Sequence, residues 1–266
     1  MNASTLALTG NVIDAEANRA RPSPLLMWLE ARAALEIASL PLALPTLLYC
    51  VPRGDGHPVL VLPGLLAGDG TTSALRGFLG SRGYRASGWG QGQNLGPREG
   101  VMQTLQETLA TMYADEQRKV SIIGWSLGGV YAREIARAAP QWVRQVITLG
   151  SPLYGDPEQS TNVSNIYHLV SGQPRGAQHM RIAAPPPVPT TSIYSRTDGV
   201  VGWESSVEQQ GAQTDNIEVN SASHIGLGVN PLVWYAIGDR LAQPEGQWSP
   251  FEPKGLAGRL FPLNAA

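Results

Sequence analysis

The sequence has 266 residues with a formal net charge of −2, 15% charged residues and 42% hydrophobic residues. This balance excludes an intrinsically disordered chain, and the lack of a lysine- or arginine-rich run argues against a nucleic-acid partner. The length suits one large α/β domain with a continuous core. The single cysteine, Cys50, excludes an internal disulfide, fits a reducing compartment and, with its apolar neighbours, predicts a buried, inert thiol.

The N-terminal part of the chain divides at residue 23. Residues 1–23 have no basic region followed by an unbroken apolar stretch, so we expect a flexible N-terminus and no secretory signal. Segment 24–51 has apolar residues at helical spacing and predicts a helix that packs on the domain, with a membrane-surface contact as the alternative. Its charged residues and prolines, which argue against a transmembrane helix, are Glu30, Arg32, Glu36, Pro41 and Pro45.

From residue 58 onward, short apolar runs alternate with helical patterns, as in the βαβ units of a parallel sheet. The predicted strands are 58–64, 84–90, 119–125, 143–152, 190–196 and 216–220. The predicted helices are 71–83, 98–118, 127–140 and 230–243. We therefore expect an α/β core formed by 52–151 and 190–266.

Regular patterning is lost over 152–189, between two predicted strands. A stretch this long inside a compact domain is typical of a functional lid or of disorder. It carries apolar residues suited to acyl chains, so we interpret it as a lid or cap insertion. A surface loop that packs its apolar residues on the domain is the alternative.

The pentad Gly124-Trp125-Ser126-Leu127-Gly128 has the G-x-S-x-G pattern of a nucleophile elbow. A predicted strand precedes it and a predicted helix follows, as an elbow requires. Ser126 is then at the carboxyl end of a parallel strand, where open α/β sheets bind their ligands. The alternative is a serine in an ordinary glycine-rich turn.

A serine nucleophile needs a base and a group that orients the base. His224 follows the predicted strand 216–220 at the expected edge of the sheet, whereas His57 precedes a strand and His168 and His179 lie in the unpatterned stretch. Asp198 directly follows the strand 190–196, and Asp156 is its rival. The order Ser126, Asp198, His224 is the Ser…Asp/Glu…His order of a hydrolase triad.

Two backbone N–H groups are also needed where negative charge develops on the substrate oxygen. We assign one to Leu127, directly after the nucleophile, and the other to Leu65, after the turn Pro63-Gly64. The alternative for this turn is a simple strand end. Three aromatic residues near these segments are candidates for the substrate pocket, although each also suits the core: Trp125, Trp203 and Tyr154.

Taken together, "VLVLPGLLAGDG", "GYRASGWGQGQNLGP", "GWSLGG", "YSRTDGVV" and "SHIGLGVNP" make residues 57–243 resemble the serine esterase and lipase branch of the α/β-hydrolase superfamily. The resemblance implies a mostly parallel sheet flanked by helices, an acyl-serine intermediate, and no metal or organic cofactor. The chain departs from it at Pro63-Gly64, where many members have His-Gly. No strand pair is evident before residue 57, so the sheet is expected to lack its first one or two strands.

The expected function is a carboxylic ester hydrolase acting on a small-molecule or lipid ester. The alternatives are an acyltransferase with the same triad and a non-catalytic binding protein on this fold. No H-E-x-x-H pattern or cysteine cluster predicts a metal site. We expect a cytoplasmic protein, with peripheral membrane contact through 24–51 as an addition; its oligomeric state does not follow from the sequence.

Overall fold

A computed structural model of the protein describes residues 21–155, 157–172, 184–253 and 259–262. Its centre is a six-stranded sheet in the order β2-β1-β3-β4-β5-β6, and every neighbouring pair is parallel. The strands are β1 Pro58–Leu62, β2 Arg85–Gly88, β3 Val120–Trp125, β4 Val143–Leu149, β5 Thr190–Tyr194 and β6 Thr214–Glu218. All six predicted strands are therefore confirmed.

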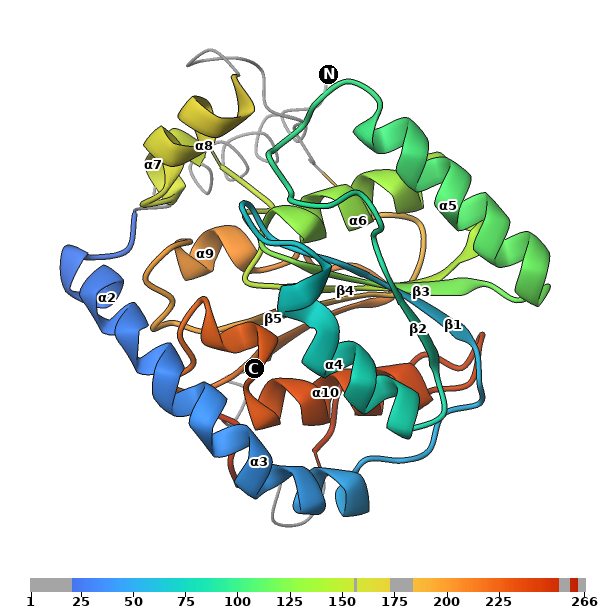
Figure 1. Cartoon of the computed structure of the whole chain (residues 1–266). Coiled ribbons are helices and arrows are strands. Elements are labelled where there is room, and N and C mark those ends of the chain that lie inside the picture. Colours follow the sequence, from blue (N-terminus) through green and yellow to red (C-terminus); the bar gives the residue numbers. More distant parts are fainter. Residues whose placement is uncertain (1–20, 156, 173–183, 254–258, 263–266) are drawn as a thin grey trace, which may run out of the picture.

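Helices cover both faces of the sheet (Figure 1). The long ones are α4 Asp69–Ser81, α5 Val101–Glu116, α6 Leu127–Ala138 and α10 Pro231–Ala242. The short ones are α7 Pro157–Ser160, α8 Ser164–Ser171, α9 Trp203–Ser206 and the 3-10 turns η2 Pro140–Trp142 and η3 Gly226–Gly228. The unpatterned stretch thus contains two short helices, α7 and α8, which its sequence did not reveal.

Alternation along the strands divides the core into two layers. Val59 and Val61 of β1 belong to the cluster formed with α4 and α10, whereas Leu60 and Leu62 belong to the cluster formed with α5 and α6. Successive side chains of a strand point to opposite faces, so a strand covered on both sides is apolar throughout. This explains why β1 reads as a continuous apolar run.

In chain order β1 is the first strand of the sheet, and the described residues before it, 21–57, contain no strand. The prediction that the sheet lacks its first one or two strands is confirmed for that part of the chain. Helix α6 ends at Ala138, two residues before the predicted end. Ala139 leaves the helical region because the following residue is Pro140, which disfavours an α conformation in the residue before it.

The N-terminal segment forms α2 Pro24–Leu29, η1 Glu30–Arg32 and α3 Ala33–Cys50, a nearly continuous helix along one side of the domain (Figure 1). Pro41 and Pro45 lie inside α3 and do not interrupt it. Proline's fixed φ suits a helix, and the lost hydrogen bonds are offset by packing of the inner face on the core. The core contacts come from Leu40, Leu44 and Leu47.

One expectation about this segment is wrong, since Cys50 is exposed rather than buried. The helix turns its charged residues toward the domain and most of its apolar residues outward: no exposed residue of Pro24–Cys50 is charged. With 27 residues, it is long and apolar enough to cross a membrane. Helical spacing identified the two faces but not which one meets the protein.

Strand β3 and helix α6 pack through glycines. A Cβ on Gly124 would lie 2.3 Å from the carbonyl oxygen of Gly128, and a Cβ on Gly128 would lie 2.4 Å from the carbonyl oxygen of Leu62. Both contacts are with backbone, which cannot move aside without displacing a strand. The turn between β3 and α6 therefore depends on these two glycines.

We expect Gly124→Ala to destabilise the fold by about 3 kcal/mol, because the added methyl overlaps backbone atoms. Gly77→Ala in α4 is the matched control: its Cβ meets nothing within 4 Å, and it should stabilise the helix by about 0.5–1 kcal/mol. Urea unfolding of both variants measures the difference. Equal stabilities would contradict the close packing.

Candidate active site

Ser126 lies at the turn between β3 and α6 with φ of 52° and ψ of −122°. This backbone conformation is unfavourable for a residue with a side chain and is found where the surrounding structure imposes it. Here the Ser126 N–H donates to Leu149 O at 2.8 Å, and the Ser126 carbonyl accepts from Gly129 N at 2.9 Å. The turn has the strained strand-to-helix geometry of a nucleophile elbow.

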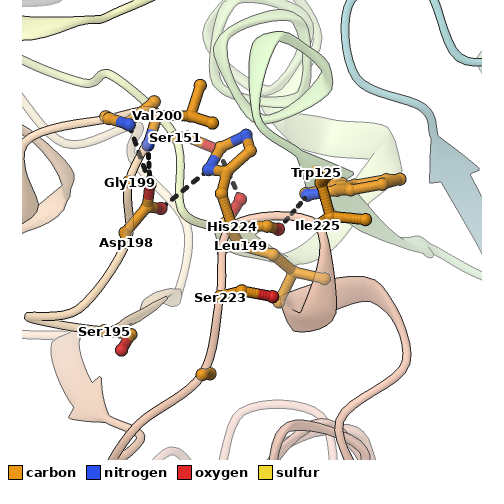
Figure 2. Close-up of polar contacts among 12 residues, drawn as sticks. Trp125, Leu149, Ser151, Ser195, Asp198, Gly199, Val200, Ser223, His224 and Ile225 are labelled. Carbon is orange, nitrogen blue, oxygen red and sulfur yellow. Dashed lines mark hydrogen bonds and ion pairs between the residues drawn. The ribbon is translucent and has the colours of Figure 1, made fainter. Parts of the chain in front are cut away.

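His224 and Asp198 form a buried pair (Figure 2). Their Nδ1 and Oδ2 atoms are 2.7 Å apart, and the residues are only 6% and 3% exposed. Asp198 comes from the loop after β5 and His224 from the loop after β6. The second oxygen of Asp198 accepts the N–H groups of Val200 and Val201, each at 2.8 Å, which fixes the carboxylate plane.

The end of β4 connects this pair with Ser126. Leu149 accepts the Ser126 N–H, and the next residue, Gly150, lies against the pair. A Cβ on Gly150 would be 2.9 Å from Asp198 Oδ2 and 3.2 Å from His224 Nδ1. Ser126, Asp198 and His224 therefore gather around the carboxyl ends of β3 and β4.

The pKa of His224 is raised above its ordinary value. Burial by itself lowers the pKa, but the charge and hydrogen bond of Asp198, together with the charge of Glu30, outweigh burial. The protonated imidazole is thus stabilised where a general base needs it. Trp125 supports the same loop, since its Nε1 donates to His224 O at 3.1 Å (Figure 2).

The two N–H groups considered for oxyanion binding differ in origin. Leu127 is the first residue of α6, so its N–H has no partner within the helix. Leu65 follows Gly64, whose Cβ, if present, would be 3.2 Å from Ser126 Cβ. Among the described residues, no acceptor binds the Leu65 N–H.

Asn94, which sequence reasoning missed, holds the loop that carries Leu65. This fully buried side chain donates to Pro63 O at 2.9 Å, and its backbone exchanges hydrogen bonds with Leu66 and Ala67. Asn94 belongs to the glycine-rich run 88–96, where only its unusual burial distinguishes it from other turn residues. Sequence carries no signal for that burial.

Among the pocket candidates, Trp203 and Tyr154 have other contact partners than Trp125. Trp203 stacks on Tyr194 at a ring-centroid distance of 5.9 Å. Tyr154 joins a buried ionic cluster, in which its hydroxyl donates to Glu208 and accepts from Arg133.

Among the other histidine and carboxylate candidates, His57 is described by the structure and does not join this group. Asp156 and His179 lie outside the described residues. His57 is completely buried before β1, between Asp55 at 2.5 Å and Ser121 at 2.8 Å. Burial lowers the pKa of His57 to about 4 despite Asp55, so it is neutral at physiological pH. A structural role for His57 agrees with this environment.

The N-terminal helix supplies the largest group of residues that sequence reasoning missed. Glu30 is 6% exposed and accepts the backbone N–H groups of Gly199, His224 and Ile225 at 2.8, 2.9 and 3.0 Å. These residues flank or include the predicted acid and base. The signal available was three charged residues in an otherwise apolar helix, which we interpreted only as evidence against a transmembrane helix.

Comparisons with known proteins support the same architecture. A family model described as a PGAP1-like alpha/beta domain matches residues 91–225. The triacylglycerol lipase of Burkholderia plantarii is 30% identical over 169 residues, which cover 60% of this chain and 45% of that lipase. The chain thus spans less than half the length of this relative.

Two solved structures have similar folds. Lipase B of Aspergillus fumigatus gives a TM-score of 0.56 at 20% identity, covering 76% of this chain and 58% of that one. The monoacylglycerol lipase of Paleococcus ferrophilus gives 0.52 at 14% identity, covering 72% and 96%. At these identities the likeness establishes the fold alone.

Replacing Asp198 by Asn should lower the pKa of His224, because burial continues to oppose protonation while the neighbouring charge is lost. Asp115→Asn, an exposed change in α5, is the control and should leave that pKa in place. NMR titration of the imidazole signals measures both. An unchanged His224 pKa in the Asp198 variant would contradict the pairing.

Proposed function

The chain belongs to the PGAP1-like α/β-domain family, and from this premise we propose that it is a serine hydrolase that cleaves carboxylic esters. The α/β-hydrolase fold and the resemblance to esterases and lipases, both predicted from sequence, are confirmed by the family match and the parallel sheet. The activity itself is inferred from the candidate site.

One observation carries the proposal: a strained serine and a buried Asp–His pair share one edge of the sheet. The 2.7 Å bond from Asp198 occupies Nδ1 of His224 and leaves Nε2 as the proton acceptor. A triad requires this arrangement, because the carboxylate orients the imidazole and stabilises its protonated form while the imidazole accepts the proton of the serine. Among loop histidines, such an arrangement favours catalysis over simple backbone support.

In the proposed reaction, His224 removes the proton of Ser126 while Ser126 Oγ attacks the ester carbonyl. The N–H groups of Leu127 and Leu65 stabilise the negative oxygen of the tetrahedral intermediate. His224 then protonates the leaving alcohol, and an acyl-serine remains. Water, deprotonated by His224, then attacks the acyl-serine, and His224 returns the proton to Ser126 Oγ as the carboxylic acid leaves. Asp198 stays ionised throughout.

The insertion between β4 and β5 supports an apolar substrate. Helix α8 exposes Ile166 and Leu169, which are 43% and 84% exposed. Arg98 donates to Val170 O at 3.1 Å, so α8 lies next to the loop that follows β2 at the active-site edge. We assign 152–189 the role of a lid for acyl chains, with Trp125 lining the pocket and Trp203 and Tyr154 as further candidates.

The outer face of α2 and α3 supports contact with a lipid surface. Its exposed apolar side chains are Leu25, Met27, Trp28, Leu29, Leu35, Ile37, Leu42, Leu48 and Tyr49. The same helix binds the domain through its charged residues, so it can lie along a bilayer without leaving the protein. Since this face is uncharged, the attraction is apolar and independent of anionic lipid.

Ser126→Ala should reduce the hydrolysis of short p-nitrophenyl esters by about 10⁴-fold or more, because no other group forms the acyl intermediate. Ser73→Ala, an exposed change in α4, should retain full activity. Analysis of the products with and without added alcohol separates hydrolysis from acyl transfer. Full turnover by the Ser126 variant would refute the assignment.

Trp28→Glu combined with Leu42→Glu should weaken binding to phosphatidylcholine vesicles by at least about tenfold, because each change removes a large apolar group from the bilayer. Leu260→Glu changes another exposed apolar residue, outside the helix, and is the control. Flotation measures the bound fraction. Unaltered flotation of the double variant would exclude this face as the contact.

A further inference from the structure

The three charged residues of the N-terminal helix all contact loops of the candidate active site. Glu30 is buried, whereas Arg32 and Glu36 are partly buried. They come from a segment more than 160 positions before these loops, yet each one binds loop backbone. Their arrangement is more specific than the packing of a helix on a core requires.

Glu30 bridges the two loops. Its Oε1 accepts the N–H of Gly199, directly after Asp198, at 2.8 Å, and the N–H of His224 at 2.9 Å. Its Oε2 accepts the N–H of Ile225 at 3.0 Å. One carboxylate therefore joins the backbone beside the acid to the backbone of the base.

Arg32 and Glu36 extend the same contact. The Arg32 guanidinium donates to Thr197 Oγ1 and to Ala222 O, both at 3.0 Å. Glu36 accepts the Ser223 N–H at 2.9 Å. Arg32 thus donates to both loops, and Glu36 accepts from the loop after β6. These hydrogen bonds fix the position of the two loops relative to each other.

We propose that Glu30 is a positioning residue for the catalytic pair, holding the loops of Asp198 and His224 in register from a helix outside the sheet. The inference rests on the proposed function for its catalytic consequence. Charged acceptors form stronger hydrogen bonds than neutral ones, and three donors share this carboxylate. The pairing between β5 and β6 ends at Tyr194 and Glu218, before either loop begins.

Glu30 also acts electrostatically on His224. His224 contacts Asp198 from the loop after β5, Glu30 from η1 and Trp125 from the elbow. Arg32 and Glu36 bind the adjoining loop backbone. Glu30 contributes to the raised pKa of His224, after burial, which lowers it, and Asp198. A residue that positioned the loops through packing alone would leave the pKa of His224 unchanged.

The test is Glu30→Gln, which keeps the size of the side chain but removes its charge and one acceptor. We expect kcat/KM for a p-nitrophenyl ester to fall by about tenfold to a hundredfold, because the base is displaced from the nucleophile. The acidic limb of the pH profile should move to lower pH, since the base must be neutral and its pKa falls. Glu107→Gln, on the exposed face of α5, should change neither.

A second variant, Glu30→Asp, keeps the charge but withdraws the carboxylate by one methylene. Its kcat/KM should fall, while the acidic limb of its pH profile should stay close to that of the wild type. Wild-type turnover in folded Glu30→Asp, or wild-type turnover and pH limb in Glu30→Gln, overturns the proposal. So does a loss fully accounted for by the unfolded fraction in thermal denaturation.

NMR titration of His224 separates this proposal from the proposed function. Glu30→Gln should lower the His224 pKa whether or not esters are the substrate, and an unchanged value overturns the role of Glu30. Reaction of Ser126 with a fluorophosphonate probe tests the nucleophile independently. Failure of the probe to label Ser126, with a shifted His224 titration in Glu30→Gln, would refute the hydrolase and keep the positioning contact.

Discussion

The close approach of β3, α6 and the end of β1 is the constraint on which the candidate site depends. Gly128 lies against the carbonyl oxygen of Leu62, and Gly124 lies against the first turn of α6. Only hydrogen side chains permit this spacing, and the short turn then forces Ser126 to a positive φ. The same turn brings Gly64 beside Ser126 and leaves the Leu127 N–H without a helical partner.

The sheet brings the loops of Asp198 and His224 to one edge, but strand pairing ends before either residue. Buried backbone N–H groups in such loops need acceptors. Glu30 supplies acceptors to three of them, and these hydrogen bonds offset the cost of burying its carboxylate. Local loop conformation and the N-terminal helix are therefore interdependent.

The helix 24–50 has the reverse of the usual amphipathic arrangement. A surface helix ordinarily turns its apolar side inward and its charged side to water. Here the charged residues satisfy loop backbone, while the inner apolar contacts are confined to a few leucines of α3. An exposed face without charge is typical of a site that meets another apolar phase. The arrangement joins such a surface to the loops of the candidate triad.

Local pattern determined the alternation of strands and helices, the elbow around Ser126, and the order of Ser126, Asp198 and His224, because each depends on residues close together in the chain. The continuity of the helix through Pro41 and Pro45, the exposure of Cys50 and the inward direction of Glu30 were decided only by tertiary structure. The burial of Asn94 was likewise decided only by tertiary structure. These features depend on what lies opposite each side chain, and the opposing residues are far away in the sequence.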